Sequence, residues 1–390
     1  MSAEHDHAGP VVAGIVTAVV GFSSAFVVVL AGLVAVGASS AEAASGLLAL
    51  CVTQALGMVW LSVRTREPVS LAWSTPGAAL LISTGAVEGG WPAAIGAFLV
   101  TAVLIVLTGL LPWLGELIGR IPVSLARAML AGVLLPICLQ PVTGLAGSPF
   151  VVGPVVLAWL VMHRISRRWA VPVSLVVALV VVLVEAGSDV DGGDLVPSLA
   201  WTTPHWTVAA VVSIAVPLYI VTMASQNVPG VAVMSSFGWT VPWREAMTVT
   251  GIGTAVGAPF GGHAINLAAI TAAMTAGPMA GPDRSRRWIA SASAAATYVV
   301  LALAASALAA LVAAAPGDVI PAAAGLALIG TFATALAGAL ADADEREPAA
   351  VCFLVAASGV SVLGIGAAFW ALLAGLVLRP VLRAVPRARV

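Results

Sequence analysis

The stretch that decides the fold is Ser70-Leu-Ala-Trp-Ser-Thr-Pro-Gly-Ala-Ala-Leu-Leu-Ile-Ser-Thr-Gly-Ala86. It predicts a short extended segment, then a polar break at Ser74 and Thr75. A helix is expected to begin at Pro76, where the missing N–H costs nothing. Such a break inside an apolar run is unusual for a simple membrane-spanning helix.

A similar stretch, nearly ungapped against the first, lies 192 positions later: Gly262-His-Ala-Ile-Asn-Leu-Ala-Ala-Ile-Thr-Ala-Ala-Met-Thr-Ala-Gly277. Asn266 takes the place of Ser74, and Gly277 that of Gly85. Two polar-interrupted segments at matching places in the halves of an apolar chain indicate the binding site of a transporter.

The composition excludes a water-soluble domain. Hydrophobic residues make up 61% of the chain, charged residues 8%, and the mean hydropathy is +1.09. We therefore expect an all-α polytopic membrane protein whose solvent is the lipid bilayer. Three cysteines stand singly, without the spacing of metal ligands, and we expect no metal, no cofactor and no nucleic acid partner.

Apolar runs separated by Gly, Pro and charge clusters predict about fourteen membrane-spanning segments. We place them at residues 11–36, 44–63, 70–87, 92–111, 124–140, 149–162, 171–187, 207–227, 244–258, 263–277, 288–314, 318–341, 348–360 and 361–379. Seven spans in each half require the second half to enter the membrane from the opposite side. The chain then divides into a first inverted repeat at 1–187, an external linker at 188–206 and a second inverted repeat at 207–390.

The arginines test this count, because every missed span would invert all later loops. With the N-terminus inside, all 16 basic residues, each of them Arg, fall in predicted cytoplasmic loops or the C-terminal tail. Both termini are therefore expected to be cytoplasmic.

Inversion makes the two short extended segments approach the bilayer centre from opposite sides, so the helices that follow them begin near one another. Each would be a half-helix of about 11 residues, roughly 16 Å long. A helix N-terminus carries unpaired N–H groups and a partial positive charge, and so holds an anion without Arg or Lys. The predicted ligand is anionic.

Side chains and backbone around the two breaks are the candidate binding residues: Trp73, Ser74, Thr75, Pro76, Gly77, Ala78, His263, Asn266, Leu267 and Ala268. Ser, Thr and Asn at these places also cap helices, and the two roles are compatible. His263 serves either as a structural hydrogen-bonding residue or as the group that carries a proton, since its ordinary pKa lies near neutrality.

Two further groups belong to the candidate site. Gln226 and Asn227 end the eighth span beside a helix breaker, where they either line the site or bond between helices. Phe22 and Phe26 share one face of the first span, where core packing is the alternative to contact with an aromatic ligand.

Three motifs resemble the benzoate membrane transport (BenE) family: Leu71-Ala-Trp-Ser-Thr-Pro-Gly-Ala-Ala-Leu80, Ala224-Ser-Gln-Asn-Val-Pro-Gly-Val-Ala-Val233 and Pro259-Phe-Gly-Gly-His-Ala-Ile-Asn-Leu-Ala-Ala-Ile-Thr-Ala-Ala273. That family is similar to uracil permease and the sulfate permeases. The resemblance implies a core domain of spans 1–4 and 8–11, a gate domain of spans 5–7 and 12–14, and elevator-like movement between them. It also implies import of benzoate with a proton across the bacterial inner membrane, and it leaves room for a homodimer.

Nucleobase carriers of this kind resemble one another in having carboxylates in spans 8 and 10. Here those places hold Gln226, Asn227 and Asn266, which agrees with an anionic substrate because an acid would repel it. The alternative function is transport of another organic anion or of an inorganic anion such as sulfate or bicarbonate on the same fold. An intramembrane enzyme is disfavoured, because the chain lacks His-Glu-x-x-His and Gly-x-Ser-x-Gly motifs.

Overall fold

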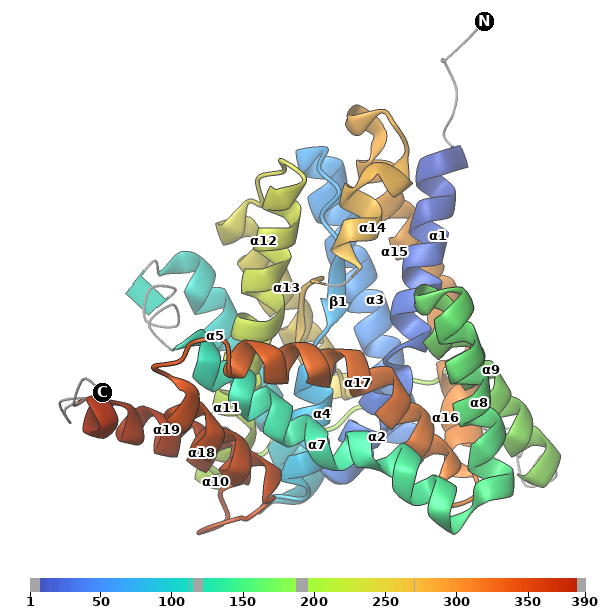
Figure 1. Ribbon diagram of the computed structural model, residues 1–390. Helices are drawn as coiled ribbons and strands as arrows, with labels where there is room; N and C mark the ends of the chain where they lie inside the picture. Colours follow the sequence, from blue (N-terminus) through green and yellow to red (C-terminus); the bar gives the residue numbers. More distant parts are fainter. Residues whose placement is uncertain (1–7, 112, 115–121, 187–195, 270, 384–390) are drawn as a thin grey trace, which may run out of the picture.

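The computed structural model describes residues 8–111, 113–114, 122–186, 196–269 and 271–383. Most of this chain is helical, and one small two-stranded sheet lies among the helices (Figure 1). The first part of the predicted linker, residues 188–195, lies outside the described residues.

The described part of the first half contains one strand, β1 (Leu71–Trp73), and eight helices. These are α1 (Ala8–Ser23), α2 (Phe26–Ala35), α3 (Ser40–Thr65), α4 (Thr75–Thr84), α5 (Gly90–Leu110), α7 (Val123–Gly147), α8 (Pro149–Ile165) and α9 (Arg167–Ala186).

The second half contains strand β2 (Ile265–Leu267) and a longer series of helical pieces. The first are α10 (Val208–Ala210), the π-helical turn η2 (Val211–Ala215), α11 (Val216–Thr222), the π-helical turn η3 (Met223–Asn227) and α12 (Val228–Ser236). Then come α13 (Trp243–Gly257), η4 (Ala258–Phe260), α14 (Ala272–Ala276), η5 (Pro278–Ala280), η6 (Arg284–Arg286), α15 (Trp288–Ala302), α16 (Ala305–Ala313), α17 (Val319–Ala339), α18 (Arg346–Ala357) and α19 (Ala367–Arg383).

Seven helices in the described part are long and apolar enough to cross a membrane, and an eighth qualifies if the pair bent by 53° around residues 303–304 is one span. Two shorter apolar helices, Pro149–Ile165 and Ala367–Val381, fall below that length. The mostly helical membrane class is thereby confirmed. The count of fourteen spans, which includes short and broken segments, stays a prediction.

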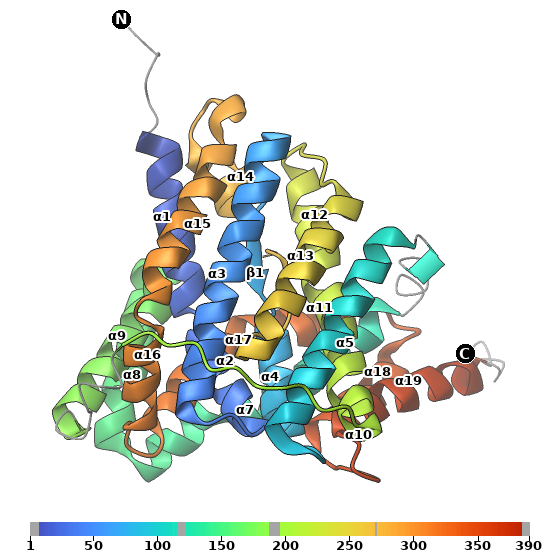
Figure 2. The same ribbon diagram turned by 180° about the vertical axis from the view of Figure 1, so that it is seen from behind.

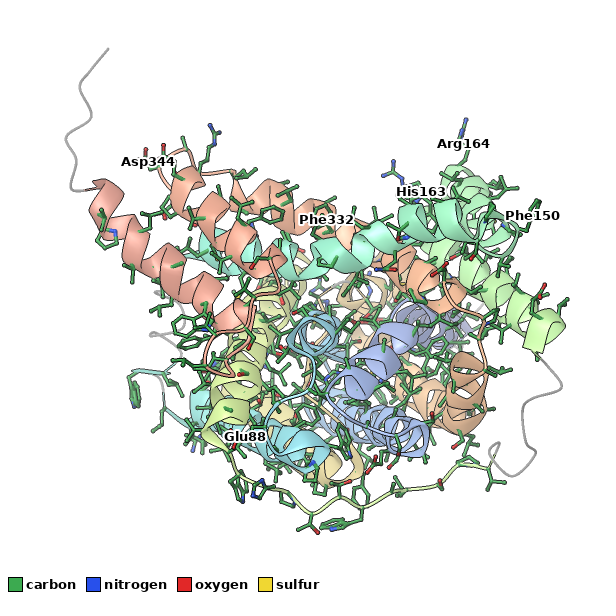
Figure 3. The ribbon with its side chains drawn as sticks, turned by 90° about the horizontal axis from the view of Figure 1, so that it is seen from below. Glu88, Phe150, His163, Arg164, Phe332 and Asp344 are labelled. Carbon is green, nitrogen blue, oxygen red and sulfur yellow. The ribbon has the colours of Figure 1, made fainter. Side chains whose placement is uncertain are left out.

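The helices gather on two sides of the molecule (Figure 3). Helices α7, α8, α17, α18 and α19 lie on one side, where α17 and α18 both pack against α7. The other side holds α1 to α5 and α10 to α16. There α15, α3, α13 and α5 stand in a row, which in the view of Figure 2 lies in front of strand β1.

Local sequence sets the ends of α3, the helix at the middle of that row. Ser39 accepts a hydrogen bond from Glu42 N while the Glu42 carboxylate accepts one from Ser39 N, which forms a capping box. Arg66 ends the helix in the left-handed conformation. Within α3, Gly46 allows the backbone of Gly261 to approach, because a Cβ there would lie 2.5 Å from Gly261 O.

The described part of the predicted linker forms an extended strap over the N-terminal ends of α3 and α5 (Figure 2). Thr202 N donates to Pro259 O at 2.8 Å, and His205 N donates to Pro92 O at 2.9 Å. Trp91 Nε1 donates to the Thr202 hydroxyl at 3.0 Å. These bonds tie the two sequence halves together at one end of the helix row.

Arginines at the opposite end of the bundle stack on tryptophans. The guanidinium of Arg66 lies 4.4 Å from the ring centroid of Trp288, and that of Arg284 lies 4.4 Å from the centroid of Trp239. Such amphipathic pairs suit the headgroup level of a membrane.

The contact between α3 and residue 261 gives a test of the packing. Gly46→Ala should lower the apparent melting temperature in detergent, because overpacking a rigid backbone contact costs roughly 1–3 kcal/mol. The matched control is Gly330→Ala in α17, where a Cβ meets nothing within 4 Å and should slightly stabilise the helix. Equal melting temperatures for the two variants would contradict the close contact.

Candidate functional site

Strands β1 and β2 cross near the middle of the molecule as an antiparallel pair (Figure 1). Leu71 pairs with Leu267, Ala72 with Asn266 and Trp73 with Ile265. Thus the two extended segments expected from the sequence are present, and they bond directly to each other. In this register Asn266 lies opposite Ala72, so the residue that aligns with Ser74 in the second stretch does not pair with Ser74 in the sheet.

Helix α4 begins directly at the end of β1, where Ser74 is its N-cap. The Ser74 hydroxyl accepts from Gly77 N at 3.1 Å, and Ala78 N donates to Ser74 O at 2.8 Å. Pro76 has no N–H, so the backbone donor left without a partner in the first turn, among the described residues, is that of Thr75. The sequence predicted several free N–H groups for an anion at this helix end. The structure offers one N–H, together with the dipole of a ten-residue helix.

The second break differs from the expected half-helix of about 11 residues. After β2, helix α14 has five residues and is N-capped at Thr271 with no side-chain bond, so Asn266 does not cap it. With its amide oriented so that both atoms are bonded, Asn266 accepts from Ser74 N at 3.0 Å and donates to Leu267 O at 2.8 Å. Asn266 therefore satisfies the strand crossing, and the prediction of two equivalent facing helices is wrong.

Gln226 and Asn227 lie in the π-helical turn η3, a distortion that is frequent at functional sites. Asn227 Oδ1 accepts from Leu267 N at 2.9 Å, while Asn227 Nδ2 lies 3.2 Å from Met223 Sδ. Asn227 thus holds β2. The Gln226 side chain is 8% exposed and makes no hydrogen bond within the described residues, which leaves its amide free for another partner.

Thr222, one turn before Gln226, contacts Ser74, and this contact was not predicted from the sequence. Its hydroxyl donates to the Ser74 hydroxyl at 2.8 Å. Both side chains are fully buried. Beside them Gly77 allows α11 to approach α4, since a Cβ there would clash with Leu218.

A row of rings runs from the break between α1 and α2 to α15. Phe22 stacks on Phe26 at a centroid distance of 5.2 Å, and Trp73 meets Phe22 edge-on at 5.7 Å. Tyr298, also missed from sequence, meets Trp73 edge-on at 5.9 Å. The row joins the aromatic residues proposed from sequence to the strand that precedes Ser74, and it supplies the edges and faces that an aromatic ligand contacts.

His263 lies just before β2, with its ring 6.4 Å from that of Phe98 on α5. The side chain is fully buried, and neither ring nitrogen has a hydrogen-bond partner within the part of the chain that the structure describes. A buried imidazole without partners costs free energy, which a bond to a water molecule or to a ligand would offset.

Charged side chains are nearly absent from the interior. The buried charged residues of the described chain are Arg287 and Glu345. Arg287 donates to Ala276 O at 2.9 Å, and Glu345 bonds to Arg379 at 2.7 Å. An anion at the strand crossing would therefore be held by neutral donors.

A cavity of about 290 Å³ lies where the two sides of the molecule meet. Ala31 and Ile82 line it from α2 and α4, while Gln140 and Pro321 line it from α7 and α17. The lining is apolar apart from the Gln140 amide. The cavity borders the same helix, α4, whose N-terminus forms the candidate site.

The family model of the benzoate membrane transport protein, BenE, matches residues 5–381. The chain belongs to this family. This match confirms the resemblance seen in the sequence. BenE proteins are membrane transporters and not enzymes.

Two relatives match the chain over nearly its full length. Inner membrane protein YdcO of Escherichia coli (strain K12) is 39% identical over 93% of each chain. The benzoate membrane transport protein of Acinetobacter baylyi is 27% identical over 94% of this chain and 93% of its own. Together with the apolar helices, they support a multi-pass protein of the bacterial inner membrane.

Solved structures share the fold at low sequence identity. The transmembrane domain of the cyanobacterial bicarbonate transporter BicA has a TM-score of 0.58 and 15% identity, covering 94% of this chain and 97% of its own. Murine Slc26a9, an anion transporter in the inward-facing state, has a TM-score of 0.63 and 13% identity, covering 98% of this chain and 69% of its own.

The bond from Asn227 to β2 predicts a loss of stability. Asn227→Leu should reduce the free energy of unfolding by about 1–3 kcal/mol, because it leaves Leu267 N–H buried without an acceptor. Thermal unfolding in detergent measures the loss. The neighbouring Gln226→Leu variant removes an amide without a protein partner and should unfold close to the wild-type temperature, so a larger loss in that control would contradict the assignment.

Proposed function

We propose that the protein is a secondary active transporter that imports benzoate or a similar aromatic carboxylate together with a proton. The observation that carries this proposal is the α4 N-terminus in a BenE chain. There the Thr75 N–H has no backbone partner among the described residues, and the buried Ser74 hydroxyl directly follows the aromatic residue Trp73. A carboxylate accepts hydrogen bonds from such donors, and its ring finds aromatic partners.

The proposed binding set keeps most of the residues expected from the sequence, but leaves out Asn227 and Asn266, whose amides bond backbone groups of the strand pair. Ser74 and Thr75 would hold the carboxylate, and Gln226 offers an amide without another partner. Phe22, Phe26 and Trp73 would form the wall against the ring. The backbone of Pro76, Gly77, Ala78, Leu267 and Ala268 completes the boundary of the site.

The proposed architecture is fourteen spans in two inverted repeats, 1–187 and 207–390. Helices α1 to α5 and α10 to α16 would form the core domain, and α7 to α9 with α17 to α19 the gate domain. The antiparallel crossing of β1 and β2 supports an inverted relation, since a two-fold axis between the strands exchanges them. The cavity between α2, α4, α7 and α17 supports movement of the core against the gate, in an elevator-like cycle.

The proposed orientation has both termini in the cytoplasm, because it puts every arginine on the cytoplasmic side. The Arg–Trp stacks at one end of the bundle support that placement. A homodimer is the proposed assembly.

Transport of an inorganic anion is the second candidate, because BicA and Slc26a9 share the fold. The aromatic row between α1 and α15 favours the carboxylate with a ring. Competition separates the two: excess benzoate should block uptake of labelled benzoate, and excess sulfate or bicarbonate should not.

Proton coupling gives the central prediction. Purified protein in proteoliposomes should accumulate labelled benzoate when the outside is made more acidic, and collapse of the pH gradient by a protonophore should stop accumulation. Protein-free liposomes control for passive entry of benzoic acid. Uptake above that control that ignores the gradient would contradict symport while leaving transport intact.

His263 is the proposed proton carrier, and the alternative is the substrate's own carboxylate. His263→Gln preserves a polar side chain without a titrating group, so it should flatten the pH dependence of uptake. Initial rates at fixed inside pH measure the effect. His205→Gln, in the strap, is the matched control and should keep the wild-type profile. An unchanged profile for His263→Gln would contradict its role as proton carrier and leave the substrate's carboxylate or a water molecule in that role.

A further inference from the structure

The hydroxyl of Ser74 has both of its acceptor positions occupied. Gly77 N donates to it at 3.1 Å and Thr222 Oγ1 at 2.8 Å. A hydroxyl has two acceptor lone pairs and one proton to donate. Within the described residues the Ser74 proton has no acceptor, so the hydroxyl is left as a buried donor.

We propose that Thr222 is a positioning residue that directs the Ser74 proton toward the carboxylate of the substrate. This inference rests on the proposed function. Thr222 does not touch the anion; its bond removes the alternative in which Ser74 rotates and offers a lone pair. A lone pair at that place would repel an anion, whereas the free O–H binds it beside the Thr75 N–H.

The bonding of other buried threonines shows that Thr222 is exceptional. Thr residues inside apolar helices commonly bond the carbonyl four residues earlier. Thr17, Thr53, Thr101 and Thr250 all do so, to Ala13, Ala49, Ala97 and Ala246. Thr222 makes no such bond to its own helix and donates across to Ser74 instead.

The helix that carries Thr222 is also the one that fixes β2. Thr222 is the last residue of α11, and Asn227 ends the π-helical turn that follows it. Asn227 bonds Leu267 N of β2, while Thr222 bonds Ser74 at the start of α4. One helix thereby sets the two breaks relative to each other, and the π-helical turn lies between its two contacts.

Packing between α11 and α4 does not require the Thr222 hydroxyl. Leu218 lies against Gly77, which already seats the two helices closely. A valine has nearly the shape of threonine, so Thr222→Val should preserve this contact while removing the donor. The experiment therefore separates a positioning role from a packing role.

The test is a double-mutant cycle on uptake of labelled benzoate into proteoliposomes. Thr222→Val should raise KM about tenfold with Vmax little changed, because one hydrogen bond to a charged ligand is weakened. Thr222→Ser should restore KM to within about twofold of wild type, since it retains the hydroxyl. In a Ser74→Ala background, Thr222→Val should add less than about twofold, because its partner is already gone.

Thr250→Val is the matched control, the same change at a buried threonine that bonds only its own helix, and should leave KM unchanged. If the valine variant fails to fold, Thr222→Ala and Thr222→Ser give the same comparison. A wild-type KM in Thr222→Val, or a KM increase that persists in full without Ser74, overturns the positioning role. Absence of benzoate uptake by the wild type overturns the proposed substrate instead, and the cycle is then run with whichever of sulfate or bicarbonate the wild type carries.

Discussion

The structure depends on one constraint: backbone N–H and C=O groups inside a membrane must find partners within the protein. Two chain segments leave the helical conformation near the middle of this molecule, and each would expose polar groups at a cost of several kcal/mol per group. They meet that constraint by bonding each other. The ladder of β1 and β2 continues beyond the strands through Ser74 N to Ala264 O and Ala268 N to Ser70 O, both at 2.9 Å.

Side chains complete the same pairing from both flanks. Thr254 Oγ1 accepts from Ile265 N at 3.1 Å, and Asn227 Oδ1 accepts from Leu267 N at 2.9 Å. The polar residues around the crossing therefore serve mainly to satisfy backbone groups. The Thr75 N–H and the Ser74 proton are donors that this network leaves without a partner among the described residues. They are therefore the groups at the strand pair that can bond a ligand.

The break at Ser74 could be predicted from the sequence, because serine, threonine and proline in an apolar run favour the start of a helix through local bonding and backbone geometry alone. The sequence also predicted a second break near Asn266. It could not predict the strand register, since register depends on which backbone groups pair between two segments far apart in the chain and on the anchor from Asn227. The short helix after β2 was also not predicted: similar composition indicated a helix of about 11 residues, whereas Ile265–Leu267 pair as strand and α14 begins only at Ala272. Thr222 could not be predicted from the sequence, because a threonine in an apolar helix normally bonds the backbone of its own helix. Only the structure shows its hydrogen bond to Ser74 at the start of a different helix.

Neutral donors at the crossing also suit the proposed cycle. Moving one elementary charge through a membrane potential changes the free energy by about 2.3 kcal/mol per 100 mV. A core domain that bound the anion with a fixed arginine would return through the membrane with that positive charge when empty. The described interior near the crossing has no such charge, so the empty core would move without electrical work. When the core is loaded, a monovalent carboxylate accompanied by one proton also sums to zero. In the proposed symport, neither the empty nor the loaded core would then move a net charge, so the membrane potential would not oppose the cycle.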